Sequence, residues 1–159
     1  MPLIRDAQFP RDKPAVLSFI DGLQRFEQAV ELDRRVDSTV ADEFFADITA
    51  RVAAKGGAML VAERDGTALG WAVVYHEQND VYVLPEEREF AYISELYVLE
   101  AARGQGVGKQ LIAACEAWAR KHQLGVIMIG VLPGNVRADA IYRNAGYSTY
   151  STQLRKYLR

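Results

Sequence analysis

Apolar residues recur along this chain at two spacings, one typical of helices and one typical of strands. Across Pro14–Val30 and Val40–Val52 they return every three or four positions. This spacing predicts two amphipathic helices. Ser38 or Thr39 is suited to cap the second helix, and Gly56 is suited to end it.

Shorter apolar runs, bounded by turn residues, predict the strands of a sheet. The strands are expected at residues 3–5, 58–63, 69–75, 91–98, 126–132 and 147–157, with further helices from the glycine-rich segment to residue 122 and over residues 136–144. Asp65-Gly66 is a strong hairpin signal, whereas the helix between strands 91–98 and 126–132 makes that pair parallel. The sequence therefore predicts an α/β fold of the α+β kind, with a mixed, mostly antiparallel central sheet.

Length and composition limit the classes of protein to which the chain can belong. The 159 residues are 50% hydrophobic and show no shift in composition, which predicts a single domain over residues 1–159. The formal net charge of -2 argues against a nucleic-acid surface. No apolar run approaches the roughly 20 residues that span a bilayer, and the first residues lack the apolar centre of a signal peptide. We therefore expect a cytoplasmic protein with neither a nucleic-acid nor a membrane partner.

The segment Arg103–Lys109, which reads Arg-Gly-Gln-Gly-Val-Gly-Lys, follows an apolar strand and precedes a helical pattern. Its glycines let a ligand approach the backbone, and the unbonded amides of a first helical turn favour an anion. A nucleotide P-loop is excluded, because it requires glycine where Arg103 stands and Ser or Thr where Gln110 stands. The dinucleotide-binding pattern also fails, since its third glycine would fall on Lys109. A site for another phosphate-bearing cofactor remains.

The order Arg-Gly-x-Gly-x-Gly after an apolar strand resembles the acyl-CoA pyrophosphate loop of the GNAT superfamily of N-acetyltransferases. The second half of that family's pattern is present as well: Asn135, then alanines, then Tyr142, then Gly146-Tyr147. The resemblance is strong from about residue 92 to residue 147 and weak before it. It implies an acyl-CoA-binding core at about residues 91–147 and a variable, acceptor-binding half at about residues 1–90.

The resemblance implies a GNAT-like fold in which the two parallel strands splay apart, helices cover both faces of the sheet, and acetyl-CoA is the acyl donor. The pantetheine arm of the donor would lie in the splay and pair with the strand backbone as an added strand does. The residues implied to bind the donor are Leu96, Tyr97, Val98, Arg103, Gly104, Gln105, Gly106, Val107, Gly108, Lys109, Asn135 and Tyr142. Asn135 is equally suited to cap the helix that follows it.

Acyl transfer to an amine requires a base, a donor to the oxyanion and a proton for the departing thiolate. By its place in the motif, Tyr142 resembles the family's general acid, although it could serve only to pack its helix on the sheet. Glu95 is the favoured base or water-orienting group, because burial in an apolar strand raises the pKa of a carboxyl group. The alternatives for Glu95 are pairing with a cation from the first helices or exposure to solvent. The amide of Val98 is the expected oxyanion donor.

Alternation along the strand 91–98 assigns its side chains to the two faces of the sheet. Glu95 is expected on one face with Ile93 and Tyr97. The other face is expected to carry Tyr92, Ser94, Leu96 and Val98.

Three other residues with reactive side chains receive mainly structural interpretations. Cys115 falls on the apolar stripe of its helix, so we expect a buried thiol, and direct transfer in a ternary complex rather than a covalent enzyme intermediate. His76 and His122 have no Cys or carboxylate cluster at ligand spacing, and no metal site is predicted. His76 stays an alternative base.

The acceptor is expected to be a primary amine of a small molecule or a peptide. A cationic amine would be attracted by acidic residues at the junction of the first two helices, namely Glu27, Glu31, Asp33 and Asp37. Ordinary solvated charge, interleaved with Arg34 and Arg35, is an equal interpretation. The competing class of function is a non-catalytic acyl-CoA sensor or interaction module. The resemblance also admits a homodimer formed through the last strand.

Overall fold

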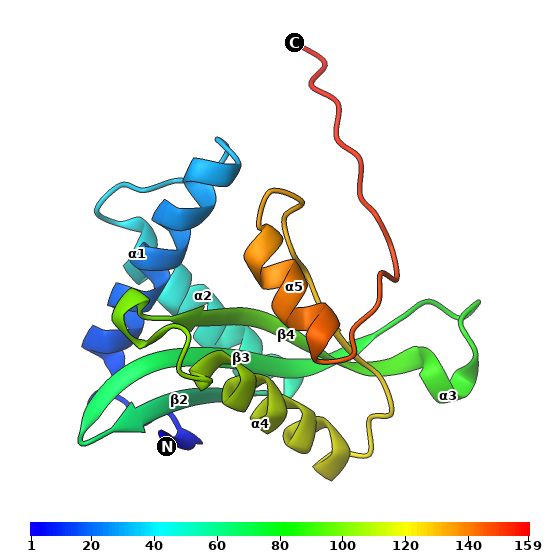
Figure 1. Cartoon of the computed structure of the whole chain (residues 1–159). Coiled ribbons are helices and arrows are strands. Elements are labelled where there is room, and N and C mark those ends of the chain that lie inside the picture. The colour runs from blue at the N-terminus through cyan, green and yellow to red at the C-terminus, as the bar shows by residue number, and fades with distance from the viewer.

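The computed structural model describes residues 1–159 and contains one five-stranded sheet (Figure 1). Its strands follow one another across the sheet in chain order: β1 (Leu3–Asp6), β2 (Ala58–Arg64), β3 (Thr67–Gln78), β4 (Glu89–Val98) and β5 (Ile127–Ile129). The pairs from β1 to β4 are antiparallel, whereas β4 and β5 are parallel. The predicted mixed, mostly antiparallel sheet is confirmed.

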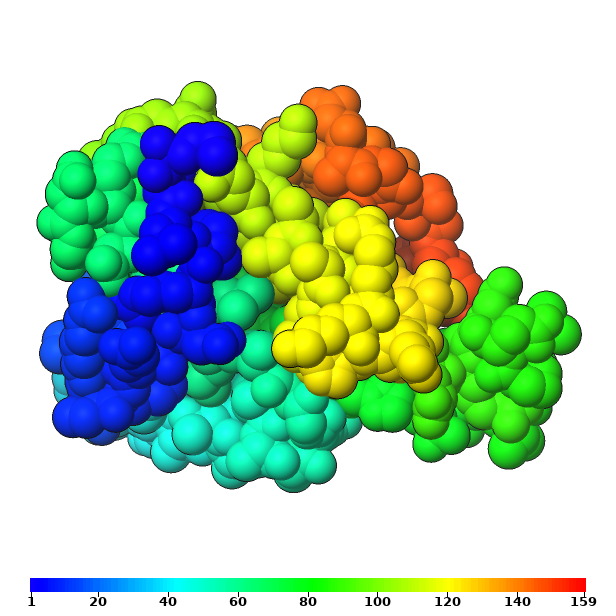
Figure 2. All heavy atoms as spheres, turned by 90° about the horizontal axis from the view of Figure 1, so that it is seen from below, coloured from blue at the N-terminus to red at the C-terminus, as the bar shows by residue number.

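Helices cover both faces of this sheet. They are α1 (Lys13–Val30), α2 (Val40–Lys55), α3 (Pro85–Arg88), the 3-10 turn η1 (Glu100–Ala102), α4 (Val107–Lys121) and α5 (Val136–Asn144). The helices α1, α2 and α5 lie on one face and α4 on the other (Figure 1), and α4 runs across the face seen in Figure 2. The four longer helices were predicted, whereas α3 and η1 are too short to show an apolar period. None of the helices is long and apolar enough to cross a bilayer.

Two apolar clusters hold these layers together, one on each face of the central strands. Toward α4 the buried side chains include Ala72, Ile93 and Leu111, and toward α1 and α2 they include Phe19 and Trp71. The central strands contribute to both clusters because their side chains alternate between the faces. The end of β4 is therefore held between α4 on one side and α1 on the other.

Cys115 belongs to the cluster that α4 forms with the sheet and is fully buried. Burial raises the pKa of its thiol to about 12. A thiol that stays protonated near neutral pH is a poor nucleophile. The structural interpretation of Cys115 agrees with this environment.

The expected strand over residues 147–157 is wrong. From Ser148 onward the chain forms no helix or strand, and it extends away from the sheet (Figure 1). A cavity of about 470 Å³ is lined by residues of β5 and by the first residues of this tail, and no ladder joins the two segments. Arg155 of the tail forms ion pairs with Glu31 and Asp33, near the end of α1.

Candidate active site

The two parallel strands pair over three residues only. Their ladder joins Ala91 to Ile127, Tyr92 to Met128 and Ile93 to Ile129. β5 ends at Ile129, whereas β4 continues to Val98. The strand expected at residues 126–132 is therefore shorter than predicted, because the two strands separate toward their carboxyl ends. This separation is the splay that the GNAT-like fold requires.

The separated end of β4 has backbone groups that point into the gap between β4 and β5. The Leu99 amide donates to the Leu69 carbonyl at 2.8 Å, and Val98 lies opposite Gly70 in the same ladder. Because antiparallel ladders alternate between bonded and non-bonded pairs, the amides of Leu96 and Val98 point away from β3 and into the gap. They are available to a ligand that lies along β4.

A β-bulge in β4 changes which side chains face which helices. Ile93 and Glu95 pair with adjacent residues of β3, so Ser94 is an extra residue without a partner on that strand. Ile93 packs in the cluster against α4, whereas Tyr97 packs with α1 and α2. The expectation that Ile93 shares a face with Glu95 and Tyr97 is wrong, because the extra residue reverses the alternation.

Glu95 lies on the face covered by α1 and α2, where it is largely buried and forms no hydrogen bond or ion pair. Burial chiefly raises the pKa of its carboxyl group to about 8, with a further contribution from the charge of Glu27 on α1. Arg51 of α2 acts in the opposite direction, but its ion pair is with Asp47. No cation from the first helices therefore neutralises Glu95. A carboxylate with this proton affinity is able to accept a proton near neutral pH.

Tyr142 reaches the same region from α5. It lines a small cavity of about 60 Å³ together with Glu27 and Leu96. Its side chain is 9% exposed. Burial first, and the charge of Glu27 second, raise the pKa of the phenol to about 12. The hydroxyl group keeps its proton near neutral pH and remains a donor.

Asn135 begins α5 and lines the cavity that contains Tyr142. Its Oδ1 accepts a hydrogen bond from the Ala138 amide at 3.2 Å. The capping interpretation of Asn135 is therefore confirmed. The side-chain NH2 group is not used by the cap, and its contact with a bound acyl donor stays a prediction.

The glycine-rich loop places unbonded amides at the start of α4. Gly104 and Gly106 have φ angles of 75° and 79°, which favour glycine. A Cβ atom at either position would meet no atom within 4 Å, so the space over the loop is open. The amides of Val107, Gly108 and Lys109 have no acceptor in the protein. With the positive end of the helix dipole, these amides fit a pyrophosphate group.

Two side chains of the loop are engaged within the protein. Arg103 donates from Nε to the Val98 carbonyl at 3.0 Å, and its guanidinium lies 5.6 Å from the centre of the Tyr97 ring. Gln105 is bonded at both ends of its side-chain amide, to an arginine of β2 and to a carbonyl of η1. Lys109 is exposed and forms no ion pair. Its ammonium is the loop's free cation, while the other two side chains hold the loop in shape.

Two glycines that sequence reasoning did not single out bring α1 close to the splayed strands. A Cβ atom at Gly22 of α1 would lie 2.4 Å from the Tyr97 hydroxyl oxygen. A Cβ atom at Gly134, after β5, would lie 2.5 Å from a methyl group of Val30. The helix α1 therefore approaches the end of β4 at Gly22 and the segment after β5 at Val30. An isolated glycine within a helical pattern is the signal that could have identified Gly22.

Glu27 differs from the other acids at the junction of α1 and α2. It accepts a hydrogen bond from Nε of Arg34 at 2.7 Å, and it also lines the Tyr142 cavity. Its negative charge acts on both Glu95 and Tyr142. The remaining acids form exposed ion pairs with arginines, as the solvated interpretation expects: Glu31, Asp33 and Asp37.

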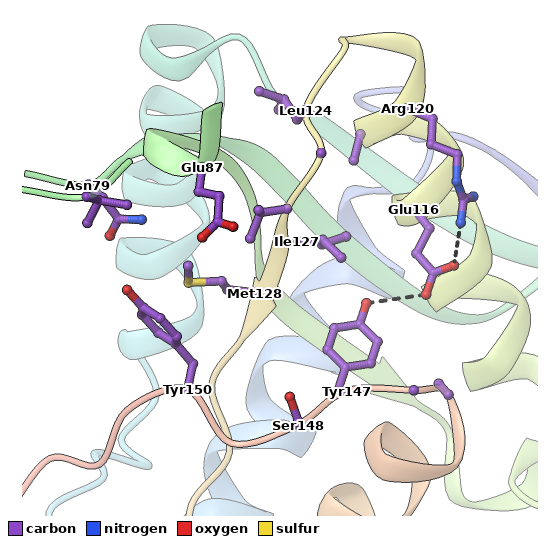
Figure 3. A pocket seen from close by; sticks show the side chains of 16 residues that line it. Asn79, Glu87, Glu116, Arg120, Leu124, Ile127, Met128, Tyr147, Ser148 and Tyr150 are labelled. Atoms are coloured by element: carbon purple, nitrogen blue, oxygen red, sulfur yellow. Dashed lines mark hydrogen bonds and ion pairs between the residues drawn. The ribbon is translucent and has the colours of Figure 1, made fainter. Parts of the chain in front are cut away.

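A larger cavity, about 470 Å³, lies elsewhere, between the end of α4, β5 and the tail (Figure 3). It contains Glu116, which contacts the Tyr147 hydroxyl at 3.5 Å and Arg120 at 3.3 Å, but none of the predicted catalytic or donor-binding residues. His76, the alternative base, lines neither cavity, and its Nε2 is 3.8 Å from Glu89. No group of three or more His, Cys, Asp or Glu side chains is arranged to hold a metal ion.

Comparison with known proteins identifies the family. Residues 21–147 match the Acetyltransferase (GNAT) family. The chain belongs to this family. Its GNAT fold is shared with the tetramutant of the BH1408 protein from Bacillus halodurans, at a TM-score of 0.81 and 23% identity, with 98% of this chain and 99% of that chain covered.

Two curated GNAT relatives have low sequence identity to the chain. Aminoglycoside N(6')-acetyltransferase type 1 of Stenotrophomonas maltophilia is 29% identical over 108 residues, which are 67% of this chain and 70% of the relative. D-amino-acid N-acetyltransferase HPA3 of Saccharomyces cerevisiae is 28% identical over 142 residues, which are 88% of this chain and 81% of the relative.

Proposed function

We propose that this GNAT protein transfers the acetyl group of acetyl-CoA directly to a primary amine within a ternary complex. The amine belongs to a small molecule or to a peptide. The names of both curated relatives describe N-acetyltransferases that act on small amines. The observation that carries the proposal is the position of Glu95 and Tyr142. Glu95, a largely buried carboxyl group with a pKa of about 8, lies on the end of β4 beyond its ladder with β5, and Tyr142, a buried phenol with a pKa of about 12, lines the cavity that Leu96 of the same strand also lines.

The acyl donor has two contact regions on this chain. Its pyrophosphate would accept hydrogen bonds from the amides of Val107, Gly108 and Lys109. Its pantetheine arm would pair with the β4 backbone at Leu96 and Val98. When bound, acetyl-CoA supplies an acetyl thioester, whose carbonyl carbon is the atom that the amine attacks. The amides in this set have no other partner, whereas the Val98 carbonyl accepts a hydrogen bond from Nε of Arg103.

Glu95 acts as the base. An aliphatic amine has a pKa of roughly 10 and arrives protonated, so it must lose a proton before it can attack. The ionised carboxylate of Glu95 takes this proton, directly or through one water molecule. Its pKa of about 8 keeps a useful fraction ionised near neutral pH and still makes it a stronger base than an exposed carboxylate.

The Val98 amide and Tyr142 act on the charges that develop next. As the C–N bond forms, the Val98 amide donates to the carbonyl oxygen on which negative charge accumulates. As the C–S bond breaks, the Tyr142 hydroxyl donates to the departing sulfur. The nitrogen loses two protons in all: Glu95 takes one before attack and releases it to solvent, and the second, lost as the amide forms, replaces the proton that passes to sulfur. The products are the acetylated amine, the free thiol of CoA and one proton.

The test is acetyl-CoA-dependent release of free thiol over a panel of polyamines, aminoglycosides, D-amino acids and peptide amines. We expect turnover with at least one of these amines, and about a 10-fold or larger loss of kcat in Glu95→Gln. If turnover is unchanged in Glu95→Gln and in Tyr142→Phe, the catalytic roles assigned to these residues are rejected, but the proposal that the protein transfers an acetyl group stands.

The alternative function, a non-catalytic acyl-CoA sensor, predicts a different pair of results. Acetyl-CoA would bind in a calorimetric titration, yet no amine of the panel would release thiol. The lack of any partner for Glu95 favours the enzyme. A largely buried carboxyl group without a partner lowers the stability of the fold, and a protein that only binds acyl-CoA has no chemical use for it.

A further inference from the structure

We propose that Glu27 binds a second ammonium group of the acceptor, so that the acceptor is an amine with at least two positive charges. This inference rests on the proposed acetyl transfer and adds the class of acceptor. Its basis is the position of Glu27, whose charge acts on both Glu95 and Tyr142 and which lines the Tyr142 cavity. Of the two carboxylates, only one is suited to accept a proton from the reacting nitrogen.

The first observation is an unused acceptor on Glu27. Arg34 donates from Nε to Oε2 of Glu27 at 2.7 Å, and another guanidinium nitrogen of Arg34 contacts Asp33. Oε1 of Glu27 accepts no hydrogen bond within the protein. The Glu27 side chain is 24% exposed and lines the Tyr142 cavity. One oxygen therefore holds the carboxylate in place while the other is available to a ligand.

The second observation is that the two carboxylates are in different environments. Glu95 has no partner, and the groups that act on it from the packed elements are Glu27 of α1 and Arg51 of α2, with Tyr92 on β4 itself. Glu27 is paired with the guanidinium of Arg34 and lines the cavity. When two neighbouring titratable groups differ in this way, they take different roles. Glu95 is the group to exchange a proton, and Glu27 is the group to hold a lasting positive charge.

The third observation concerns the surface between them. Ser94 and Leu96 of β4 line the Tyr142 cavity together with Leu23 of α1. The Ser94 hydroxyl oxygen is buried and has no hydrogen-bond partner. An aliphatic spacer fits against Leu23 on the α1 side of this cavity, and a nitrogen of the acceptor gives the unpaired Ser94 hydroxyl a partner. The lining therefore suits a short chain or ring that carries nitrogen at two points.

The same charges disfavour an amino acid as acceptor. Its carboxylate would lie near Glu27 and Glu95, and the two cations that act there are already paired, Arg34 with Glu27 and Asp33 and Arg51 with Asp47. Like charges at this range raise the free energy of binding. We therefore expect putrescine to be a better acceptor than D-alanine, although one relative is named as a D-amino-acid N-acetyltransferase.

The test compares two acceptors of equal length, putrescine and n-pentylamine, in which a methyl group replaces the second ammonium. For the wild-type protein we expect kcat/KM for putrescine to exceed that for n-pentylamine about 10- to 100-fold, the range of one charge-assisted contact. Glu27→Gln should reduce this ratio to about threefold or less, through a higher KM for putrescine. It should leave the KM for acetyl-CoA unchanged.

Glu31→Gln is the matched control, because it removes the same charge from the same end of α1. Glu31 is paired with Arg155 outside the cavity, so the putrescine preference should persist. A wild-type ratio near one, an equal loss of preference in both variants, or a preference for D-alanine over putrescine would overturn the inference. Turnover of n-pentylamine in that case still supports the proposed acetyl transfer.

If no amine of the wider panel is acetylated, the proposed function fails, and if only putrescine and n-pentylamine are not, it stands; in both cases the inference is still decided by binding. Putrescine and n-pentylamine are then titrated into the protein with CoA present, in a calorimeter. Tighter binding of putrescine that is lost in Glu27→Gln and kept in Glu31→Gln supports the second-ammonium site. Equal binding of the two amines, or no binding of either, rejects it.

Discussion

Glu27 of α1 and Tyr142 of α5 line the same cavity, and the charge of Glu27 adds to burial in raising the pKa of the phenol to about 12. This pKa keeps the proton on Tyr142 but lies roughly three units above that of a thiol. Complete proton transfer to the departing thiolate is therefore uphill. The main contribution of Tyr142 should be a hydrogen bond to sulfur in the transition state.

Tyr142→Phe should therefore lower kcat about 10-fold, the effect of one hydrogen bond to a developing charge, rather than the several hundredfold of a well-matched acid. The KM for acetyl-CoA should stay within about twofold, because backbone groups hold the donor. Steady-state thiol release measures both. The control is Tyr147→Phe, whose hydroxyl contacts Glu116 in the other cavity. An equal loss of kcat in the control would contradict the role of Tyr142.

The second prediction concerns the pH dependence of the reaction. The pKa of Glu95 is raised to about 8, and its ionised form is the base. For the wild-type protein kcat/KM should rise with pH and level off above a pH of about 8. In Glu95→Gln this limb should be absent, and any remaining rise should follow the pKa of the acceptor amine. If the rise of kcat/KM with pH stays at the same pH in the variant, the group that titrates near a pH of about 8 is not Glu95.

The same group makes a prediction for stability. The folded-state pKa of Glu95 lies above the ordinary carboxyl value of 4.5, so the native state binds more protons than the unfolded state between these values. The free energy of unfolding should therefore fall as pH rises from about 4.5 to about 8. Glu95→Gln removes this loss and should be about 2–4 kcal/mol more stable than the wild type at a pH of about 9. Near pH 5 the two proteins should differ little.

Urea unfolding of both proteins across this pH range measures the difference. A variant whose advantage is independent of pH would show that better packing, and not the ionisation of Glu95, causes it.

Several parts of the fold and the site were predictable because local signals and packing agree. The helical apolar periods of α1, α2 and α4 are visible in the sequence because one face of each helix is buried. Gly104 and Gly106 adopt φ angles that suit glycine, and Tyr142 follows a helix that Asn135 caps. In each case a single residue type meets a local backbone requirement. Such requirements can be recognised in the sequence without knowing which residues lie next to each other in the folded protein.

Other parts depend on contacts between distant segments and had no local signal. The bulge at Ser94 is visible only as a register shift against β3. The strand pattern at residues 147–157 is real, but a strand also needs a partner edge, and no ladder joins the tail to β5. No local sequence signal distinguishes Glu27 from the other acids near the end of α1, because its position beside Tyr142 is set by the packing of α1 on β4.

The loop assignment predicts that a large side chain at Gly106 blocks the donor. The space above Gly106 is open, so Gly106→Trp should fold and should raise the Kd for acetyl-CoA at least about 100-fold by filling the pyrophosphate site. The left-handed backbone at this position adds a stability loss of about 1–2 kcal/mol. The control is Gly66→Trp in the β2–β3 turn, where φ is 78° and the space is also open.

Gly66→Trp carries the same backbone strain without a ligand site nearby. Both variants should therefore lose similar stability in thermal unfolding, and only Gly106→Trp should lose acetyl-CoA binding in a calorimetric titration. Normal binding by a folded Gly106→Trp protein would reject the pyrophosphate site at this loop.

The close approach of α1 to β4 predicts a variant that affects the acceptor and not the donor. A Cβ atom at Gly22 would lie 2.4 Å from the Tyr97 hydroxyl, so Gly22→Ala must move α1 or the ring, at a cost of about 1–3 kcal/mol in the free energy of unfolding. Movement of α1 displaces Glu27 and should raise the KM for the acceptor several-fold. The Kd for acetyl-CoA should change by less than about twofold, because backbone amides of the loop hold the donor, although the Tyr97 ring also lies against Arg103 of that loop.

Gly125→Ala is the control, since a Cβ atom there meets nothing within 4 Å. It should leave the free energy of unfolding within about 0.5 kcal/mol of the wild type. Adding Tyr97→Leu to Gly22→Ala removes the clashing ring end and should recover most of the acceptor KM, as a double-mutant cycle would measure. If the acceptor KM rises in Gly22→Ala and is not recovered in the double variant, the clash with Tyr97 is not the cause of the rise. The contact between Gly22 and Tyr97 then does not set the position of α1.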